Sequence, residues 1–126
     1  MKLHYAQNSR AVRVAWLLEE LKVSYNVEKY HVGDRILRQP EYKKIHPLGR
    51  IPVLEDNDVI IYESGAIIEY ILAKYGNGKL RPDSTDPNFA DYLQWFHFSE
   101  GMLMPPINTI VVETILLGPD RRNQTN

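Results

Sequence analysis

Two serines lie where a strand-like pattern changes to a helical one, and residues at such positions are often able to bind or activate a ligand. Ser9 ends a polar turn ahead of a helical pattern that begins near Arg10. Ser64 follows Glu63 at the start of another helical pattern. A helix start carries unpaired amide donors and a partial positive charge, so it stabilises anions, including carboxylates and thiolates. The ordinary role of a serine there is to cap the helix, and that alternative stays open for both residues.

A third position of interest is Pro52, at the start of an apolar strand pattern over 52–55. A proline removes a backbone donor, so it is tolerated at strand edges and first positions. X-Pro is also the bond type for which a cis peptide is cheap. We expect a cis bond and a bend at Ile51–Pro52 that turns the Val53 amide and carbonyl away from the sheet, free to pair with a ligand. The alternative is a proline that only marks a sheet edge.

The elements that position these residues follow from the spacing of apolar side chains. Residues 2–5 and 25–30 alternate as half-buried strands do, and a helical pattern lies between them over 10–21. Two strands joined by one helix form a parallel pair with a right-handed crossover. The helix is expected to turn inward Val12, Ala15, Trp16, Leu21, and either Leu17 or Leu18.

The next stretch predicts the rest of a small α/β sandwich. A short helical segment over 35–44 is interrupted by Pro40, and a hairpin follows over 52–62. The helix from Ser64 is expected to stop at residues 76–78, where glycine supplies a left-handed C-cap. Its core-facing side chains are expected to be Ile67, Ile68, Ile71, Leu72 and Tyr75.

Beyond a polar, proline-containing linker, the chain becomes helical and apolar again. Pro105 would collide with the carbonyl of Gly101, so the helix that starts near Phe89 is expected to kink or end there. A second apolar run covers 107–117, and the polar end, 118–126, is expected to fray.

Composition excludes several classes of function. The chain has no cysteine, which rules out disulfide exchange, thiolate zinc sites and cysteine nucleophiles. Its net charge of −1 and lack of a basic run argue against nucleic acid and anionic membrane surfaces. Four scattered histidines argue against a metal site. With no signal peptide and no run of about 18 apolar residues, a cytoplasmic protein without a membrane span is expected.

The motifs HPLGRIPVLED (46–56) and ESGAIIEYI (63–71), taken together, resemble the cytosolic glutathione transferases, and among them the serine-type enzymes of bacteria and fungi. The resemblance covers residues 1 to about 105. It implies a thioredoxin-like β-α-β-α-β-β-α domain over 1–80, a linker over 81–87, and the first, kinked helix of an all-α domain over 88–126. That last domain is shorter than in the family.

The resemblance implies that Ser9 is the catalytic residue and donates its hydroxyl to the sulfur of bound glutathione. Lowering a thiol pKa of about 8.5 by about 2 units takes about 2.7 kcal/mol. One hydrogen bond to a charged acceptor supplies about 1.5–3 kcal/mol and a helix start about 0.3–1 kcal/mol, so ionisation gains at most about thirtyfold. Tyr5 is the rival, but its place in the strand pattern favours core packing.

The resemblance also implies how glutathione is held. The first amides of the helix at Ser64 and its hydroxyl take the γ-glutamyl carboxylate, while Glu63 meets the ammonium group. Val53 pairs with the cysteinyl unit, backbone to backbone. The further binding residues are Arg50, Ile51 and Arg38, with Arg38 a candidate for the glycine carboxylate. His46 is expected to be structural.

Two classes of function stay open. The first is a glutathione transferase that joins the glutathione thiolate to a small electrophile, with glutathione as co-substrate and no cofactor. The second is a silent glutathione-binding or dimerisation module, or an inactive fragment. Exposed apolar helix faces favour a homodimer. The residues that could line a second-substrate pocket are Tyr92, His97, Phe98, Met102 and Met104, though such a stripe is more often core.

Overall fold

The computed structural model of this protein describes residues 1–117. The chain divides into two compact units, Met1–Arg81 and Pro82–Asn126. The polar end that was expected to fray, 118–126, lies outside the described residues.

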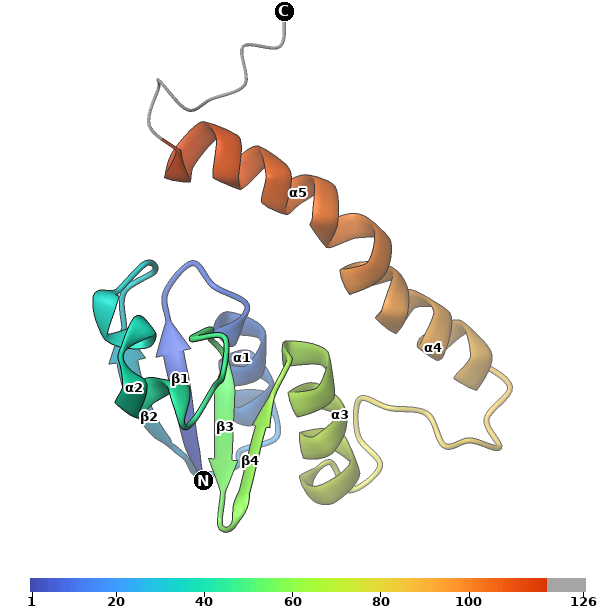
Figure 1. Ribbon diagram of the computed structural model, residues 1–126. Coiled ribbons are helices and arrows are strands. Elements are labelled where there is room, and N and C mark those ends of the chain that lie inside the picture. The colour runs from blue at the N-terminus through green and yellow to red at the C-terminus, as the bar shows by residue number, and fades with distance from the viewer. Residues whose placement is uncertain (118–126) are drawn as a thin grey trace, which may run out of the picture. The chain divides into compact units, whose positions relative to one another are not determined.

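The first unit is built on a four-stranded sheet with the order β2-β1-β3-β4 (Figure 1). The central strand β1 pairs in parallel with β2 and antiparallel with β3, and β3 pairs antiparallel with β4. This mixed sheet confirms the expected thioredoxin-like β-α-β-α-β-β-α class. The strands are β1 (Lys2–Ala6), β2 (Asn26–Tyr30), β3 (Val53–Asp56) and β4 (Val59–Tyr62).

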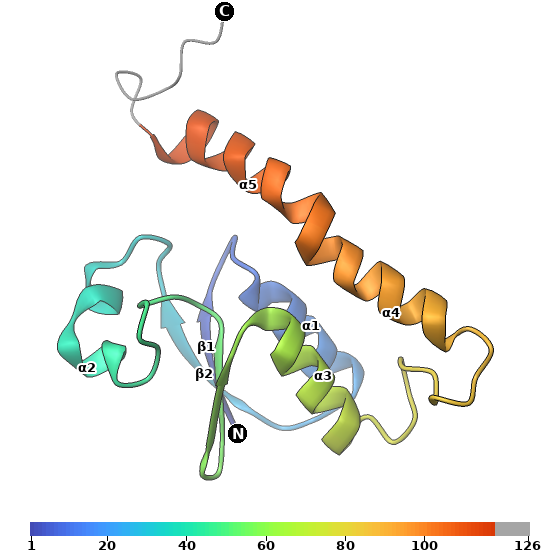
Figure 2. The same cartoon turned by 45° about the vertical axis from the view of Figure 1, so that its right-hand side comes forward.

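Helices cover both faces of this sheet. Figure 2 shows α1 (Ala11–Glu20) and α3 (Ser64–Tyr75) side by side on one face. The other face carries a 3-10 turn, η1 (Arg35–Arg38), and the short helix α2 (Pro40–Lys43). Pro40 opens α2, a position where its missing N–H costs nothing, so the expected interruption within 35–44 is confirmed.

The main core lies between the sheet and the α1–α3 face. Its buried members are Leu3, Val14, Leu17, Leu18, Leu54, Ile67, Ile71 and Leu72. The inward face expected for α1 was wrong for two residues, since Val12 is 44% exposed and Trp16 59% exposed. Apolar residues lie on two sides of this helix, so the spacing alone did not identify which side meets the sheet.

The C-terminus of α3 differs from the expectation. Gly76 has a φ of −72° and is not left-handed, whereas Asn77 and Gly78 have φ values of 48° and 76°. A Cβ at Gly76 would lie 2.4 Å from the Leu72 carbonyl oxygen. Glycine is therefore needed at position 76 for space, and the left-handed turn follows one residue later.

Over residues 82–117, the regular structure of the second unit is helical. Its elements are α4 (Phe89–Phe98), the π-helical turn η2 (Ser99–Leu103), α5 (Met104–Val111) and the π-helical turn η3 (Val112–Leu116). The interruption expected at Pro105 is present as η2, because proline offers no N–H to the Gly101 carbonyl and the chain widens by one residue there. Across residues 1–117, no helix combines the length and apolar character that crossing a membrane requires.

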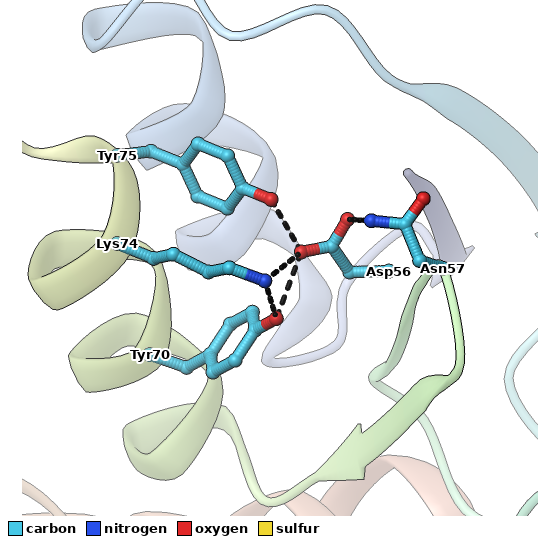
Figure 3. A network of polar contacts seen from close by, with 5 residues as sticks. All are labelled: Asp56, Asn57, Tyr70, Lys74 and Tyr75. Carbon is cyan, nitrogen blue, oxygen red and sulfur yellow. Dashed lines mark hydrogen bonds and ion pairs between the residues drawn. The ribbon is translucent and has the colours of Figure 1, made fainter.

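A buried carboxylate joins the β3–β4 hairpin to the C-terminal half of α3 (Figure 3). Asp56 is 3% exposed, and its Oδ2 accepts from the Tyr75 hydroxyl, from the Tyr70 hydroxyl at 2.8 Å and from Lys74 Nζ at 3.3 Å. The hydrogen bond from Tyr75, followed by those from Tyr70 and Lys74, holds the pKa of Asp56 below its usual range. Charge-assisted hydrogen bonds thus compensate for burying the carboxylate.

A depressed pKa in the folded state makes the contribution of Asp56 to stability pH-dependent. This contribution is complete above the unfolded pKa of about 3.9 and is lost as the pH falls toward the lower folded value. We expect Asp56→Asn to lower the free energy of unfolding at neutral pH by about 2–3 kcal/mol and to flatten its loss in acid. Urea unfolding across that pH range measures both effects.

The matched control is Asp58→Asn, on the same hairpin but exposed. It is expected to unfold as the wild-type protein does at every pH. An Asp56→Asn protein as stable as the wild type at neutral pH would show that the Asp56 network contributes nothing.

Candidate functional site

The strand order brings three segments to one edge of the sheet. Because β3 runs antiparallel to β1, the carboxyl end of β1 lies beside the amino end of β3. Because β4 runs antiparallel to β3, its carboxyl end, where α3 begins, lies at that same edge. In Figures 1 and 2 the turn after β1, the loop before β3 and the start of α3 share one end of the first unit. Ser9, Ile51 and Ser64 occupy these three segments.

Ser9 lies in the turn between β1 and α1 and is half-buried. Its hydroxyl donates to the Ala6 carbonyl at 2.7 Å and accepts from the Ala11 amide at 3.1 Å. The helix begins at Ala11 with Arg10 as the N-cap, so Ser9, for which capping was the alternative role, lies one residue before the N-cap position. Ser9 nevertheless satisfies the first helical amide, which is the capping function in a different register.

The start of α3 is strained and carries no side-chain cap. Glu63, the N-cap residue, has φ 72° and ψ 115°, a region that residues with a Cβ rarely adopt. Ser64 is the first helical residue, so the alternative in which it caps the helix is wrong. The first helical hydrogen bond runs from the Ile67 amide to the Glu63 carbonyl at 2.9 Å. The amides ahead of Ile67 therefore point beyond the helix toward the edge of the sheet.

The loop before β3 is fixed from two sides. The Tyr42 hydroxyl donates to the Arg50 carbonyl at 2.9 Å. Gly49 has a φ of 61°, and a Cβ there would lie 2.1 Å from the Leu37 carbonyl oxygen and 3.9 Å from the Arg38 amide. Only glycine allows this approach. The turn at Gly49 thus lies against the backbone of Leu37 and Arg38. Arg38 and Arg50 are both exposed residues.

The structure corrects the backbone orientation expected of Val53. The Ile51–Pro52 bond is cis, as expected, but Val53 pairs with His4 in β1 and with Tyr62 in β4. Val53 is fully buried. Since β3 has a strand on each side, the Val53 backbone belongs to the sheet and is not turned away from it. Ile51 precedes β3 and lies outside both ladders, so it presents the backbone available at this edge.

A buried polar cluster beneath the loop was missed by the sequence analysis. His4 is 1% exposed; its Nε2 lies 2.5 Å from Glu55 and its Nδ1 2.9 Å from the Tyr30 hydroxyl. A carboxylate only accepts, so Nε2 carries a proton and donates it to Glu55. The His4 and Tyr42 rings also contact each other in a T-shaped arrangement, with 5.7 Å between their centroids. Strand alternation predicts that the His4 side chain lies on the opposite face of the sheet from Leu3. The spacing does not identify the hydrogen-bond partners of His4.

Burial sets the ionisation of the tyrosines in this cluster. Burial, followed by the neighbouring Tyr30, raises the pKa of Tyr42 far above its ordinary value. Burial, followed by the charges of Glu28 and Glu55, raises the pKa of Tyr30. Both phenols are therefore neutral donors at physiological pH, and Tyr42 keeps its hydrogen for the Arg50 carbonyl.

The other candidate residues fall in different places. Tyr5 packs against the main core, as expected for a residue in the strand pattern. The residues considered for a second-substrate pocket belong to the second unit, where Phe98 is 40% exposed and Met102 67% exposed. Those two side chains are not core residues in the described part of the chain.

A mixed sheet with a cis-proline loop and two helix starts at one edge defines the thioredoxin-like class of domains. The family model described as "Glutathione S-transferase, N-terminal domain" matches residues 1–73. The chain belongs to this family.

Similar proteins share more of the chain than the matched domain. Glutathione S-transferase 3 of Schizosaccharomyces pombe is 42% identical over 106 residues, which are 82% of this chain and 42% of the relative. Glutathione S-transferase 1 of Saccharomyces cerevisiae is 37% identical over 123 residues, 92% of this chain and 51% of the relative. The chain thus spans about half the length of these relatives.

A solved structure matches the fold closely. The glutathione transferase URE2P8 from Phanerochaete chrysosporium, solved with oxidized glutathione, has a TM-score of 0.82 at 30% identity. The match covers 92% of this chain and 55% of that chain. It includes the start of the helical domain as well as the sheet.

The strained backbone of Glu63 generates a stability prediction. Relieving such a conformation returns about 1–3 kcal/mol, whereas the extra flexibility of glycine in the unfolded chain costs about 0.5–1 kcal/mol. We therefore expect Glu63→Gly to raise the free energy of unfolding by about 1 kcal/mol. Glu63→Ala keeps the Cβ and the strain, and serves as the matched control. Urea unfolding compares the two, and a glycine variant less stable than the alanine variant would show that position 63 is unstrained.

Proposed function

We propose that this chain forms the glutathione-binding half of a glutathione transferase, which joins the thiolate of glutathione to a small electrophile. The observation that carries the proposal is the meeting of Ser9, Ile51 and the uncapped start of α3 at one sheet edge. The names of the relatives and the oxidized glutathione bound by URE2P8 support it. Glutathione is a co-substrate, and the proposed reaction uses no cofactor.

The γ-glutamyl end of glutathione fits the start of α3. Its carboxylate would accept from the amides of Ser64 and Gly65, where the helix dipole favours a negative charge. Its ammonium group would meet the Glu63 carboxylate, which the strained backbone presents on an exposed residue. The ammonium and carboxylate groups, both attached to one carbon of the ligand, would thus meet opposite charges on adjacent residues.

The remainder of the tripeptide fits the loop before β3. We assign backbone pairing with the cysteinyl unit to Ile51 in place of Val53, because the Val53 backbone belongs to the sheet. Arg50 and Arg38 supply positive charge for the glycine carboxylate. The backbone of Arg38 lies against the turn at Gly49, the residue before Arg50, which supports this pairing of roles.

Ser9 stabilises the thiolate by less than the sequence suggested. Its hydroxyl hydrogen already goes to the Ala6 carbonyl, so donating to sulfur replaces one hydrogen bond with another. A bond to a charged acceptor contributes about 1.5–3 kcal/mol and a neutral one about 1 kcal/mol, so the net gain is about 1 kcal/mol. That corresponds to about fivefold in the thiolate fraction. Most of the rate enhancement then falls to positioning of the electrophile.

The protein is thus proposed to be a serine-type transferase, and to work in the cytoplasm. Its electrophile is a small molecule, and neither nucleic acid nor a membrane is a partner. A transferase of this kind needs a second-substrate site beyond the first unit, and the aromatic and methionine side chains of α4 and η2 would contribute to one.

The second candidate function is a silent glutathione-binding or dimerisation module. The observation that favours it is the exposure of large apolar side chains on the second unit, among them Trp95 at 62% and Ile110 at 59%. None of the described residues of α4, η2 and α5 is buried. Exposed apolar helix faces of this kind need cover, and a second copy of the chain would supply it. We propose a homodimer in either case.

Substitution of Ser9 separates the two candidate functions. Ser9→Ala is expected to raise the pKa of the bound glutathione thiol by about 0.7 and to lower kcat/KM about fivefold with an aryl halide, with little change in Kd. The thiolate absorbance of the bound tripeptide and steady-state rates measure these effects. Ser9→Thr keeps the hydroxyl and is the matched control.

A wild-type chain that binds glutathione without turnover supports the silent module. Equal rates for Ser9→Ala and wild type would remove Ser9 from the mechanism. Urea unfolding of each variant separates these effects from the loss of the Ala6 and Ala11 hydrogen bonds, which costs about 1 kcal/mol.

The proposed homodimer predicts a mass in solution of twice the 14.7 kDa of one chain. Trp95→Glu and Ile110→Glu each place a charge in the apolar surface and are expected to shift light scattering toward the monomer. Gln94→Glu, on a neighbouring exposed residue, is the control and is expected to leave the dimer intact. A monomeric wild-type chain at high concentration would refute the dimer.

A further inference from the structure

His46 is buried in the loop that leads from α2 to the proposed glutathione site. It is 3% exposed, and its backbone amide donates to the Tyr42 carbonyl at 2.9 Å. A histidine so deeply buried has its ring atoms committed to specific neighbours. Those neighbours lie on both sides of the proposed site, and the inference below therefore rests on the proposed function.

One set of contacts closes the turn before Ile51. The Nδ1 atom of His46 accepts from the Leu48 amide at 3.1 Å, and the His46 carbonyl accepts from the Gly49 amide at 2.8 Å. The side chain and the backbone of one residue thus hold the two residues ahead of Arg50. The Tyr42 hydroxyl holds the Arg50 carbonyl from the other side. Together these bonds determine where the Ile51 backbone lies.

The other contact reaches the start of α3. The His46 ring packs against Tyr62, with 4.4 Å between the ring centroids and 35° between the planes. Tyr62 is the last residue of β4 and directly precedes Glu63. His46 therefore touches the segment that presents the proposed ammonium-binding carboxylate as well as the loop that presents the cysteinyl-binding backbone.

We propose that His46 is a positioning residue that couples these two segments, and that protonation of its Nδ1 opens the turn and weakens glutathione binding in acid. Because Leu48 presents an N–H, the nitrogen opposite must carry no proton, so the neutral ring is protonated on Nε2. A cationic ring would direct an N–H at the Leu48 amide and lose that hydrogen bond.

The charged and titratable groups near the ring act in opposite directions. Burial is the largest effect and lowers the pKa of His46; Glu63 at the β4–α3 junction raises it, and Arg50 in the loop lowers it. From α2, Tyr42 contributes its carbonyl, and from β4, Tyr62 contributes the face of a phenol ring. The neutral form is therefore stabilised near neutral pH, and the turn opens only as the pH falls below the usual histidine range of about 6.5.

Two substitutions separate the acceptor from the ring. His46→Asn keeps a side-chain acceptor that reaches an amide two residues on, and it does not titrate. His46→Phe keeps a ring beside Tyr62 and has no acceptor. His31→Asn, on an exposed histidine after β2, is the matched control. Calorimetry with S-methylglutathione, whose blocked sulfur does not ionise, between about pH 5 and pH 8 avoids the ionisations of the ligand's carboxylates, amine and thiol.

The Kd of the wild-type chain is expected to rise about fivefold from the upper to the lower end of that range. His46→Asn is expected to bind within about twofold of wild type at the upper end and to show a flat profile, and His46→Phe to bind about tenfold more weakly throughout. His31→Asn is expected to follow the wild type. A wild-type profile in His46→Asn, or wild-type affinity in His46→Phe, would overturn the proposal.

A second measurement needs no variant and decides the case if His46→Phe does not fold. In NMR titrations of the wild-type chain, the Leu48 amide and the His46 ring are expected to titrate with one common midpoint. A Leu48 amide that ignores the ionisation of His46 would overturn the coupling. A chain that binds no glutathione at any pH contradicts the proposed function itself, whereas tight binding with a flat profile contradicts only the role of His46.

Discussion

The antiparallel pairing of β1 with β3 is the constraint on which the rest of the first unit depends. In register, Leu3 faces Leu54 and His4 faces Val53, so one pair enters the main core while the other enters the smaller core beneath α2. The same pairing reverses the direction of β3 and brings its amino end beside the carboxyl end of β1. A parallel β3 would carry Ile51 to the opposite edge, away from Ser9.

The elements with strong local signals could be predicted from the sequence. Alternation identified β1 and β2, the turn residues at 56–58 identified the β3–β4 hairpin, and Pro40 marked the interruption between η1 and α2. The segments around Ser9, Pro52 and Ser64 were recognisable because turn chemistry, proline and helix starts leave marks in single residues. These marks do not require knowledge of partners distant in the chain.

Features that depend on tertiary partners could not be predicted. Val12 and Trp16 lie on an exposed side of α1, because the sheet selects the face centred on Val14 and Leu18. The Val53 backbone is taken up by strands on both sides, one of them 49 residues away in sequence at His4. The positive φ of Glu63 follows from the path of the chain between β4 and α3. The sequence gives no signal for it, because position 63 is neither glycine nor asparagine. His46 looks like any loop histidine until its burial against Tyr62 is known.

The most direct test of a glutathione site at this edge is amide NMR of the full chain titrated with reduced glutathione. The largest shift changes are expected at the amides of Ala11, Ile51, Ser64 and Gly65, which lie on the three converging segments. Changes concentrated at the opposite edge, around the β3–β4 turn at Asn57, or no saturable change at millimolar ligand, would contradict the assignment of this edge as the binding site.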